Sequence, residues 1–172
     1  MNITDLGGFG DGTYRLFNYT GALTNNGLLF NAVPGVYNLT VNTATAGEIN
    51  LLVATATEQY WNGPNTSPTG AIEGGTGTWD AATTNWTNAA GNASFAWLGG
   101  LDAIFQGAAG TVTIANGFTA NPGDIYFNTD GYVLAATGSG SLDIAGGSAI
   151  DVNAGDATIS APITGVGALT KT

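Results

Sequence analysis

The sequence contains no cysteine and no histidine, and its only basic residues are Arg15 and Lys171. Without cysteine there can be no disulfide framework, thiolate zinc site or cysteine nucleophile. Without histidine there is no imidazole to act as a general base near neutral pH. Most of the common catalytic apparatus is therefore excluded.

Charged residues are also scarce. They make up 8% of the 172 residues, against roughly 25% in an average soluble domain. Glu, Lys and Arg favour surface helices, so we expect few helices. The chain is instead rich in Gly (28), Thr (25) and Asn (17), while 44% of it is hydrophobic. Such a composition favours strands and turns over disorder, and we predict an all-β protein.

The net charge of −10 excludes two classes of partner. A phosphate backbone or an anionic lipid surface would be repelled by most of this surface, so we expect no nucleic acid partner. The sequence has no apolar run of about 18 residues, the length that a membrane span needs. No basic, apolar leader follows Met1, so we predict no membrane insertion by this segment and place any export signal upstream.

The chain divides into three regions by pattern. Residues 1–57 contain three predicted strands, Thr13–Tyr19, Tyr37–Thr43 and Glu48–Thr55, of which the last two alternate well enough to form a hairpin. Residues 58–100 hold all four tryptophans among Gly, Pro, Asn and Thr, which indicates a looped connector. Residues 101–172 consist of short apolar pieces separated by Gly or Asn, none long enough for a helix.

A single offset of 25 residues relates the apolar residues of the third region to one another. The aligned pairs are Ile125 with Ile150, Phe127 with Val152, Leu134 with Ile159, Ile144 with Leu169, and Asn128 with Asn153. Short strands that recur in this way predict a solenoid in which each coil stacks on the next and inward side chains form ladders. The alternative is a β-sandwich of similar short strands.

These pieces occur in an order that resembles a known family. The relevant segments are YWNG at 60–63, GTWD at 77–80, TNWT at 84–87, DAIF at 102–105, TVTI at 111–114, GYVL at 131–134 and ATISAPITGVGALTK at 157–171. Over residues 58–172 the sequence resembles the passenger regions of bacterial autotransporters that carry the passenger-associated β-strand repeat. The last segment looks like a repeat cut short at residue 172.

The resemblance implies a right-handed parallel β-helix on the outside of a Gram-negative cell, exported through a C-terminal membrane barrel that this sequence does not contain. It implies a structural or adhesive role as a stalk or display scaffold. The expected partners are neighbouring passenger coils of the same chain, with surface glycans or further copies as additional partners. Residues 1–57 would be the end of a preceding passenger unit.

A polysaccharide-cleaving enzyme is the less favoured alternative. It would need two or three close carboxylates, or a calcium site with a basic residue as proton acceptor. The candidates are Asp124, Asp130, Asp143, Asp151 and Asp156. We favour turn and solvation roles for them, because Arg15 is the one arginine and lies far away in the sequence. We therefore predict no catalytic residues and no enzyme activity.

Two glycine-rich segments could suggest bound ligands. GGSAIDVNAG at 146–155 is faintly similar to calcium-binding β-rolls, but its spacing is wrong and it does not recur. GSGS at 138–141 lacks the Lys and Ser/Thr that follow a phosphate-binding loop. We predict no metal site and no cofactor.

The tryptophans support a second alternative function. Trp61, Trp79, Trp86 and Trp97 could form an exposed platform for sugar rings, as in carbohydrate-binding modules, although we favour a core role. Six Asn-x-Ser/Thr sequons begin at Asn2, Asn18, Asn38, Asn65, Asn85 and Asn92. In a chain this rich in Asn and Thr we interpret them as accidental.

Overall fold

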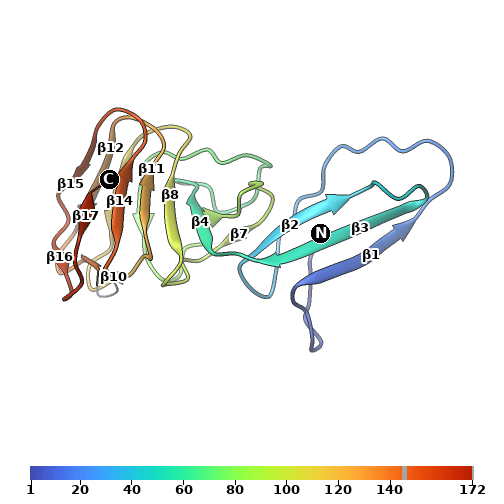
Figure 1. The fold of residues 1–172 in the computed structure, drawn as a ribbon, viewed down its shortest axis with the longest axis horizontal. Coiled ribbons are helices and arrows are strands. Elements are labelled where there is room, and N and C mark those ends of the chain that lie inside the picture. The colour runs from blue at the N-terminus through green and yellow to red at the C-terminus, as the bar shows by residue number, and fades with distance from the viewer. Residues whose placement is uncertain (145–146, 172) are drawn as a thin grey trace.

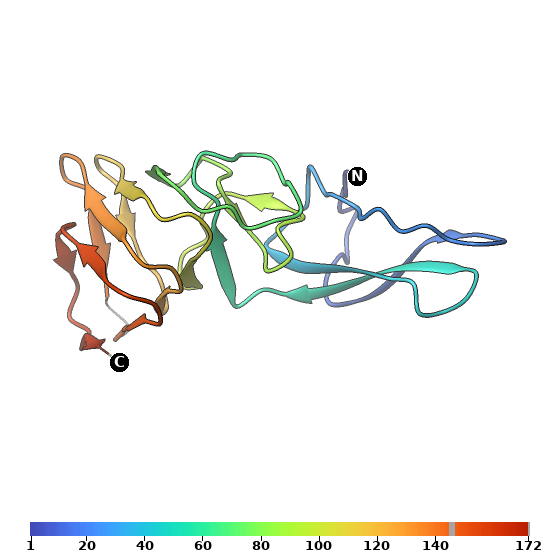
Figure 2. The same cartoon turned by 90° about the horizontal axis from the view of Figure 1, so that it is seen from above.

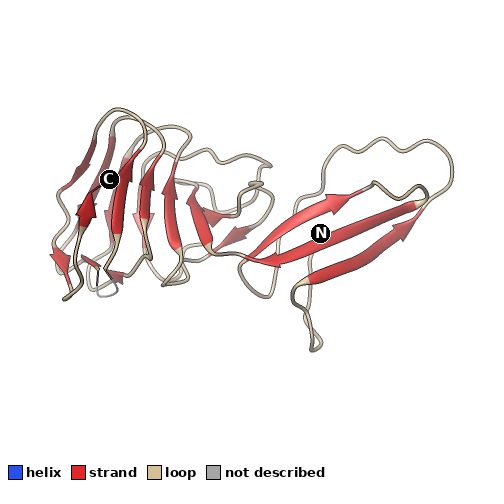
Figure 3. Ribbon diagram, viewed as in Figure 1, coloured by secondary structure: helices blue, strands red, loops and turns tan. Residues whose placement is uncertain are grey.

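A computed structural model describes residues 1–144 and 147–171 as an elongated stack of strands (Figures 1 and 2). An antiparallel sheet forms the N-terminal end, and parallel coils form the C-terminal end. All the regular structure in the described residues is β-strand (Figure 3). No helix in this part of the chain is long and apolar enough to cross a membrane. The predicted all-β class is confirmed.

The N-terminal sheet has the order β1–β3–β2 and is antiparallel throughout. Its strands are β1 (Gly12–Asn18), β2 (Tyr37–Asn42) and β3 (Glu48–Thr55). The three predicted strands and the predicted hairpin are confirmed. The pairing of β1 with β3 shifts between Arg15 and Phe17, so that Leu16 is an extra residue in β1.

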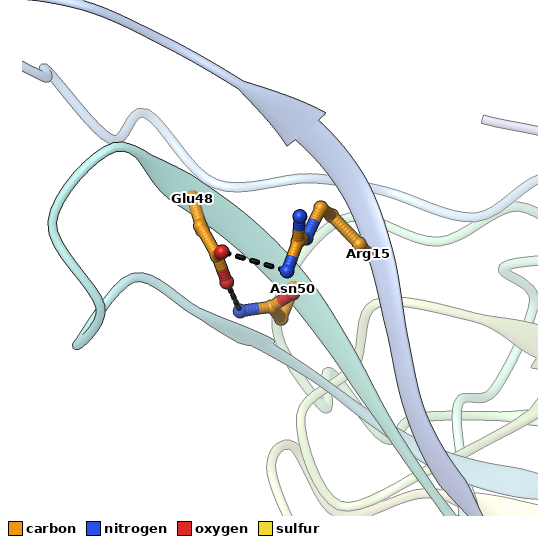
Figure 4. A network of polar contacts seen from close by, with 3 residues as sticks. All are labelled: Arg15, Glu48 and Asn50. Atoms are coloured by element: carbon orange, nitrogen blue, oxygen red, sulfur yellow. Dashed lines mark hydrogen bonds and ion pairs between the residues drawn. The ribbon is translucent and has the colours of Figure 1, made fainter.

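One face of this sheet is apolar. Leu39, Leu51 and Val53 are buried on it and pack with Phe30 from the connection between β1 and β2. The opposite face carries polar side chains. There Arg15 forms an ion pair with Glu48 at 2.7 Å, and Glu48 also accepts a hydrogen bond from the Asn50 amide (Figure 4). The alternation of the sequence thus sets which face contributes to the core.

The C-terminal part is a parallel β-solenoid of about three turns built on three sheets. The longest sheet contains β4 (Glu58–Trp61), β6 (Trp86–Thr87), β7 (Ser94–Phe95), β8 (Asp102–Phe105), β11 (Ile125–Phe127), β14 (Ala149–Val152) and β17 (Thr170–Lys171). The second contains β5 (Gly77–Trp79), β9 (Thr111–Ile114), β12 (Tyr132–Ala136) and β15 (Ala157–Ile159). The third contains β10 (Thr119–Ala120), β13 (Ser141–Asp143) and β16 (Ile163–Thr164).

The predicted register holds in two of the three sheets. Ile125 pairs with Ile150 and Phe127 with Val152 between β11 and β14. Leu134 pairs with Ile159 between β12 and β15. These predicted pairs are confirmed, and the parallel pairing excludes the β-sandwich alternative.

The predicted alignment of Ile144 with Leu169 is wrong. In the third sheet Leu142 pairs with Ile163, and the Ile144 amide donates to the Thr164 carbonyl. Leu169 instead precedes β17, which pairs with β14. The cause is a difference in connection length, because the chain from Ile159 to Ile163 is shorter than the chain from Leu134 to Leu142 in the coil before.

Inward side chains form the ladders that a solenoid requires. The rings of Phe105 and Phe127 stack with centroids 5.1 Å apart and planes at 18°. Val112 and Leu134 are fully buried and pair between β9 and β12. Apolar area is thereby removed from water between every two coils, which is the main driving force for stacking.

The first turn of the solenoid is irregular. β6 pairs antiparallel with β4, and β7 pairs antiparallel with β6, so that Trp86 lies opposite Trp61 and Phe95 lies opposite Trp86. The same turn contains a close backbone crossing, where a Cβ on Gly63 would collide with the Gly74 carbonyl. Gly63 has φ of +60° there. Only glycine fits there without strain.

Candidate functional site

Aspartate side chains join successive coils at one corner of the solenoid. The Asp102 carboxylate accepts a hydrogen bond of 2.8 Å from the Asp124 backbone N–H. The Asp124 carboxylate in turn accepts one of 2.8 Å from the Ala149 N–H in the next coil. Each carboxylate thus satisfies a backbone donor one coil further along.

Asp and Asn side chains also bond to the next coil at two other corners. The Asp130 carboxylate accepts from the Asp156 N–H, and the Asn128 side-chain carbonyl accepts from the Asn153 amide, both at 2.8 Å. At another turn the Asn116 side-chain carbonyl accepts from the Ser139 N–H at 3.0 Å. We call these bonds, with the two above, the inter-coil caps. The alignment of Asn128 with Asn153 is confirmed, and these contacts give Asp124 and Asp130 a structural role.

Carboxylates also surround a tyrosine on the longest sheet. Partial burial, followed by the negative charges of Asp124, Asp102 and Asp151, raises the pKa of the Tyr126 phenol. Tyr60 on β4 donates to Glu58 at 2.8 Å, and burial together with this bond raises the pKa of Tyr60 to about 12. Both phenols therefore stay protonated near neutral pH and serve as donors to carboxylates.

The five candidate aspartates are distributed over different parts of the coil. Asp151 lies in β14 of the longest sheet and Asp124 directly precedes β11 of the same sheet, while Asp143 lies on β13 in the third. Asp130 and Asp156 lie in turns before the second sheet. No group of three or more acidic side chains within residues 1–144 and 147–171 is arranged to hold a metal ion. Arg15, the candidate base, is paired with Glu48 in the N-terminal sheet.

The glycine-rich segments are parts of ordinary coils. Of residues 146–155, Gly146 lies outside the described residues. Asp151 falls in β14, and Asn153 makes its inter-coil cap. Gly155 has φ of +58° and passes so close to Asp130 that a Cβ would collide with its carboxylate. GSGS at 138–141 forms the turn that receives the cap from Asn116.

The four tryptophans form a buried cluster. Trp61, Trp79 and Trp86 are fully buried, and Trp97 is 7% exposed. The Trp86 ring lies 4.5 Å from that of Trp97 and 4.9 Å from that of Trp79, measured between centroids. An exposed platform for sugar rings is therefore wrong for these residues. They close the apolar core of the first turn, which agrees with the core role that we favoured.

Two asparagines of the connector protect an edge of the N-terminal sheet. The Asn88 amide donates to the Tyr37 carbonyl at 3.1 Å, and the Asn92 amide donates to the Leu39 carbonyl at 2.8 Å. Both carbonyls belong to β2, the edge strand, whose open hydrogen-bonding groups would otherwise invite pairing with another chain. Asn92 stands out in the sequence only as part of a sequon, and no pattern indicates Asn88.

The C-terminal end of the solenoid presents an apolar hollow of about 300 Å³. We call it the open end, and its lining is Phe127, Ile150, Val152, Ala157, Ile159, Ile163, Leu169 and Lys171. Ile163 and Leu169 are 42% and 44% exposed there. The hollow has the inward-facing composition of the ladders beneath it, so it is suited to receive another apolar layer.

Asp80, directly after Trp79, provides a test of the turn that positions the tryptophan cluster. Burial raises its pKa, but hydrogen bonds from the Thr83 and Ala82 N–H groups and the Thr83 hydroxyl outweigh burial and lower the pKa overall. The folded state thus favours the carboxylate. Its contribution is present above the unfolded pKa of about 3.9 and is lost as pH falls through the lower folded value.

We therefore expect Asp80→Ala to lower the free energy of unfolding by about 1 kcal/mol at neutral pH, as for loss of a cap. Urea melts at neutral and acidic pH measure the loss. The difference from the unaltered protein is expected to shrink in acid, and Asp80→Asn, which keeps one acceptor oxygen, should lose less. A loss that is equal at both pH values would contradict this account.

Comparison with known proteins gives one informative match. Over 116 residues, 64% of its length, the chain is 40% identical to a protein named "Adhesin BmaC autotransporter" from Brucella suis biovar 1 (strain 1330). The chain spans only 3% of the length of that protein. No family model matches the sequence, and no solved structure matches it. The resemblance to autotransporters is thus supported by a partial homologue and by the β-solenoid fold.

Proposed function

We propose that the chain is a non-catalytic structural and adhesive segment of an exported bacterial surface protein. The observation that carries this proposal is the continuity of coil-to-coil contacts: apolar ladders fill the core, and inter-coil caps engage the carboxylates of Asp124 and Asp130. The name of the partial homologue, an autotransporter adhesin, supports the same role. We assign residues 58–172 to a passenger-associated repeat.

A stack of this kind is suited to hold other parts of a protein at a distance. Each coil contacts only its neighbours, so added coils lengthen the stack without changing its cross-section. Residues 1–57 would form the end of a preceding unit, residues 58–100 a connector that contains the irregular first turn of the solenoid, and residues 101–172 the regular coils of the repeat. The next coil of the same chain would cover the open end, which supplies an apolar layer of matching composition.

Surface location can be tested directly in the full-length protein. An epitope inserted in the connection between β1 and β2, where residues 20–27 are exposed, should bind antibody on intact cells of the source bacterium. Labelling that appears only after the cells are permeabilised would contradict an extracellular position. Cells that carry the same protein without the epitope serve as the control and should not be labelled.

Adhesion can be tested with the chain itself. Beads coated with the purified chain are expected to bind epithelial cells or abiotic surfaces more than beads coated with the Leu134→Lys variant, whose solenoid should be unfolded. Equal binding by both kinds of bead would reject an adhesive role that depends on the fold. A stalk role would then remain testable by the surface labelling.

The proposal also predicts no cleavage of polysaccharides. We expect incubation with a panel of acidic and neutral polysaccharides to release no new reducing ends, because the candidate aspartates are distributed over three parts of the coil. Reproducible cleavage that disappears in Asp143→Asn or Asp151→Asn would show that the chain is an enzyme.

A further inference from the structure

Three Asn–Gly pairs lie in very different surroundings, at Asn26–Gly27, Asn62–Gly63 and Asn116–Gly117. In such a pair the glycine nitrogen can reach the asparagine side chain easily, because glycine has no Cβ to restrict the backbone. We propose that Asn26 is a site of spontaneous deamidation, and that the fold slows the same reaction at Asn116 and blocks it at Asn62.

The reaction needs only water and a base from the solvent. The Gly27 backbone nitrogen loses its proton and attacks Cγ of Asn26, and a bond from this nitrogen to Cγ forms. The bond from Cγ to Nδ2 breaks, and the nitrogen leaves as ammonia with a proton from water. Water then opens the resulting succinimide at either carbonyl and leaves aspartate or isoaspartate. No oxidation or reduction is involved.

Asn26 has the freedom that this attack requires. It lies exposed in the connection between β1 and β2, which has no strand over residues 19–29. Within the described residues its side chain makes no hydrogen bond, so Cγ is free to turn toward the Gly27 nitrogen. The Gly27 N–H donates to the neighbouring Asn25 side chain at 2.9 Å, and this exposed local contact must open before the attack. A Cβ on Gly27 would meet nothing within 4 Å, so the turn has room to rearrange.

Asn116 is equally exposed but its side chain is held. Its carbonyl oxygen accepts from the Ser139 N–H at 3.0 Å and lies 3.4 Å from the Ser139 hydroxyl. Cγ must leave this inter-coil cap before Gly117 can attack it. We expect deamidation slower than at Asn26 by up to about five-fold, the factor that corresponds to one net hydrogen bond of about 1 kcal/mol.

Asn62 is protected by the core. It is fully buried, and its side-chain carbonyl accepts from the Glu73 N–H at 2.8 Å. Gly63 is fixed against Gly74 at the backbone crossing. The attack therefore requires local unfolding of the first turn, which occurs rarely in a stable core.

The consequence at Asn26 is a new negative charge beside an apolar groove. Asn26 lines a hollow of about 280 Å³ together with Phe17, Leu23, Leu28, Val41 and Ile49. A carboxylate there disfavours burial of this edge, and isoaspartate also lengthens the backbone. Ageing of the protein should therefore loosen the connection first and leave the solenoid intact.

The test is peptide mapping by mass spectrometry after incubation of the native chain in mildly alkaline buffer. Isoaspartate is identified by labelling with isoaspartyl methyltransferase. We expect conversion in the order Asn26, Asn116, Asn62, and we expect this order to disappear in concentrated urea, where the three Asn–Gly pairs lose their surroundings. The Asn26→Gln variant should lose the fast phase of ammonia release.

Two results would overturn the proposal. One is conversion of Asn26 in the native chain no faster than that of Asn62. The other is an order that persists unchanged in urea, which would show that the adjoining sequence and not the fold sets the rates.

Discussion

Trp86→Ala is expected to lower the free energy of unfolding by about 3–5 kcal/mol, as for other buried aromatic residues. Trp86 is fully buried and its ring contacts those of Trp61, Trp79 and Trp97, with centroids 4.5 to 5.2 Å apart. Its removal opens a cavity where several rings meet, and the irregular first turn has no regular ladder to close it. Urea melts followed by far-ultraviolet circular dichroism measure the loss.

The matched control is an aromatic residue outside the core. Phe17 in β1 is 56% exposed, and Phe17→Ala should lower stability by no more than about 1 kcal/mol. Losses of similar size in the two variants would mean that the tryptophan cluster is not the core of the first turn.

Leu134→Lys is expected to unfold the solenoid. Leu134 is fully buried and pairs with Val112 on one side and Ile159 on the other. An ammonium group there would lie unpaired between coils, at a cost of several kcal/mol, which is comparable with the total stability of a domain, about 5–15 kcal/mol. Loss of the cooperative transition in a urea melt would show it.

Thr158→Lys provides the control on the adjoining coil. Thr158 is exposed on β15, beside Ile159, and side chains alternate across a strand. A lysine there should cost less than about 1 kcal/mol. If Thr158→Lys destabilised the chain as much as Leu134→Lys, the inward and outward assignment of these strands would be wrong.

The stability cost of a buried lysine should depend on its position along the stack. Ile159 is only half-buried, because it lies at the open end. Ile159→Lys should therefore cost less than Leu134→Lys, since the ammonium can reach water through the hollow. Equal costs at both positions would indicate that the open end is closed in solution, as by a second copy. Measuring the loss at several protein concentrations distinguishes that case.

Two strands of the N-terminal sheet, β2 and β3, could be predicted from alternation. Leu39 and Val41, and Leu51 and Val53, stand two positions apart in the sequence, and the structure places them on the apolar face. No pattern in the sequence indicates that Leu16 is an extra residue in β1. The insertion shows only in the pairing with β3, where the register shifts.

The solenoid register could be predicted only where connection lengths repeat. The offset from Ile125 to Ile150 equals the offset from Leu134 to Ile159, so one period describes both sheets. The third sheet returns after a shorter stretch of chain, so the same period misassigns Ile144. Only a period that differs between sheets places Leu142 opposite Ile163.

The polar contacts were largely invisible in the sequence. The inter-coil caps join residues 22 to 26 positions apart. The hydrogen bonds from Asn88 and Asn92 to β2 join residues more than 50 positions apart. Asp and Asn are common in turns for local reasons, so nothing in one sequence separates a local turn residue from one that bonds to the next coil. The matching positions of Asn128 and Asn153 were the single usable signal.

The most direct test of the stacked coils is the direction of strand pairing, measured by nuclear Overhauser contacts between β11 and β14. Parallel coils predict contacts of Ile125 with Ile150, Tyr126 with Asp151 and Phe127 with Val152, so that both residue numbers rise together. Contacts in which one residue number rises while the other falls would show antiparallel strands, and the solenoid would be contradicted.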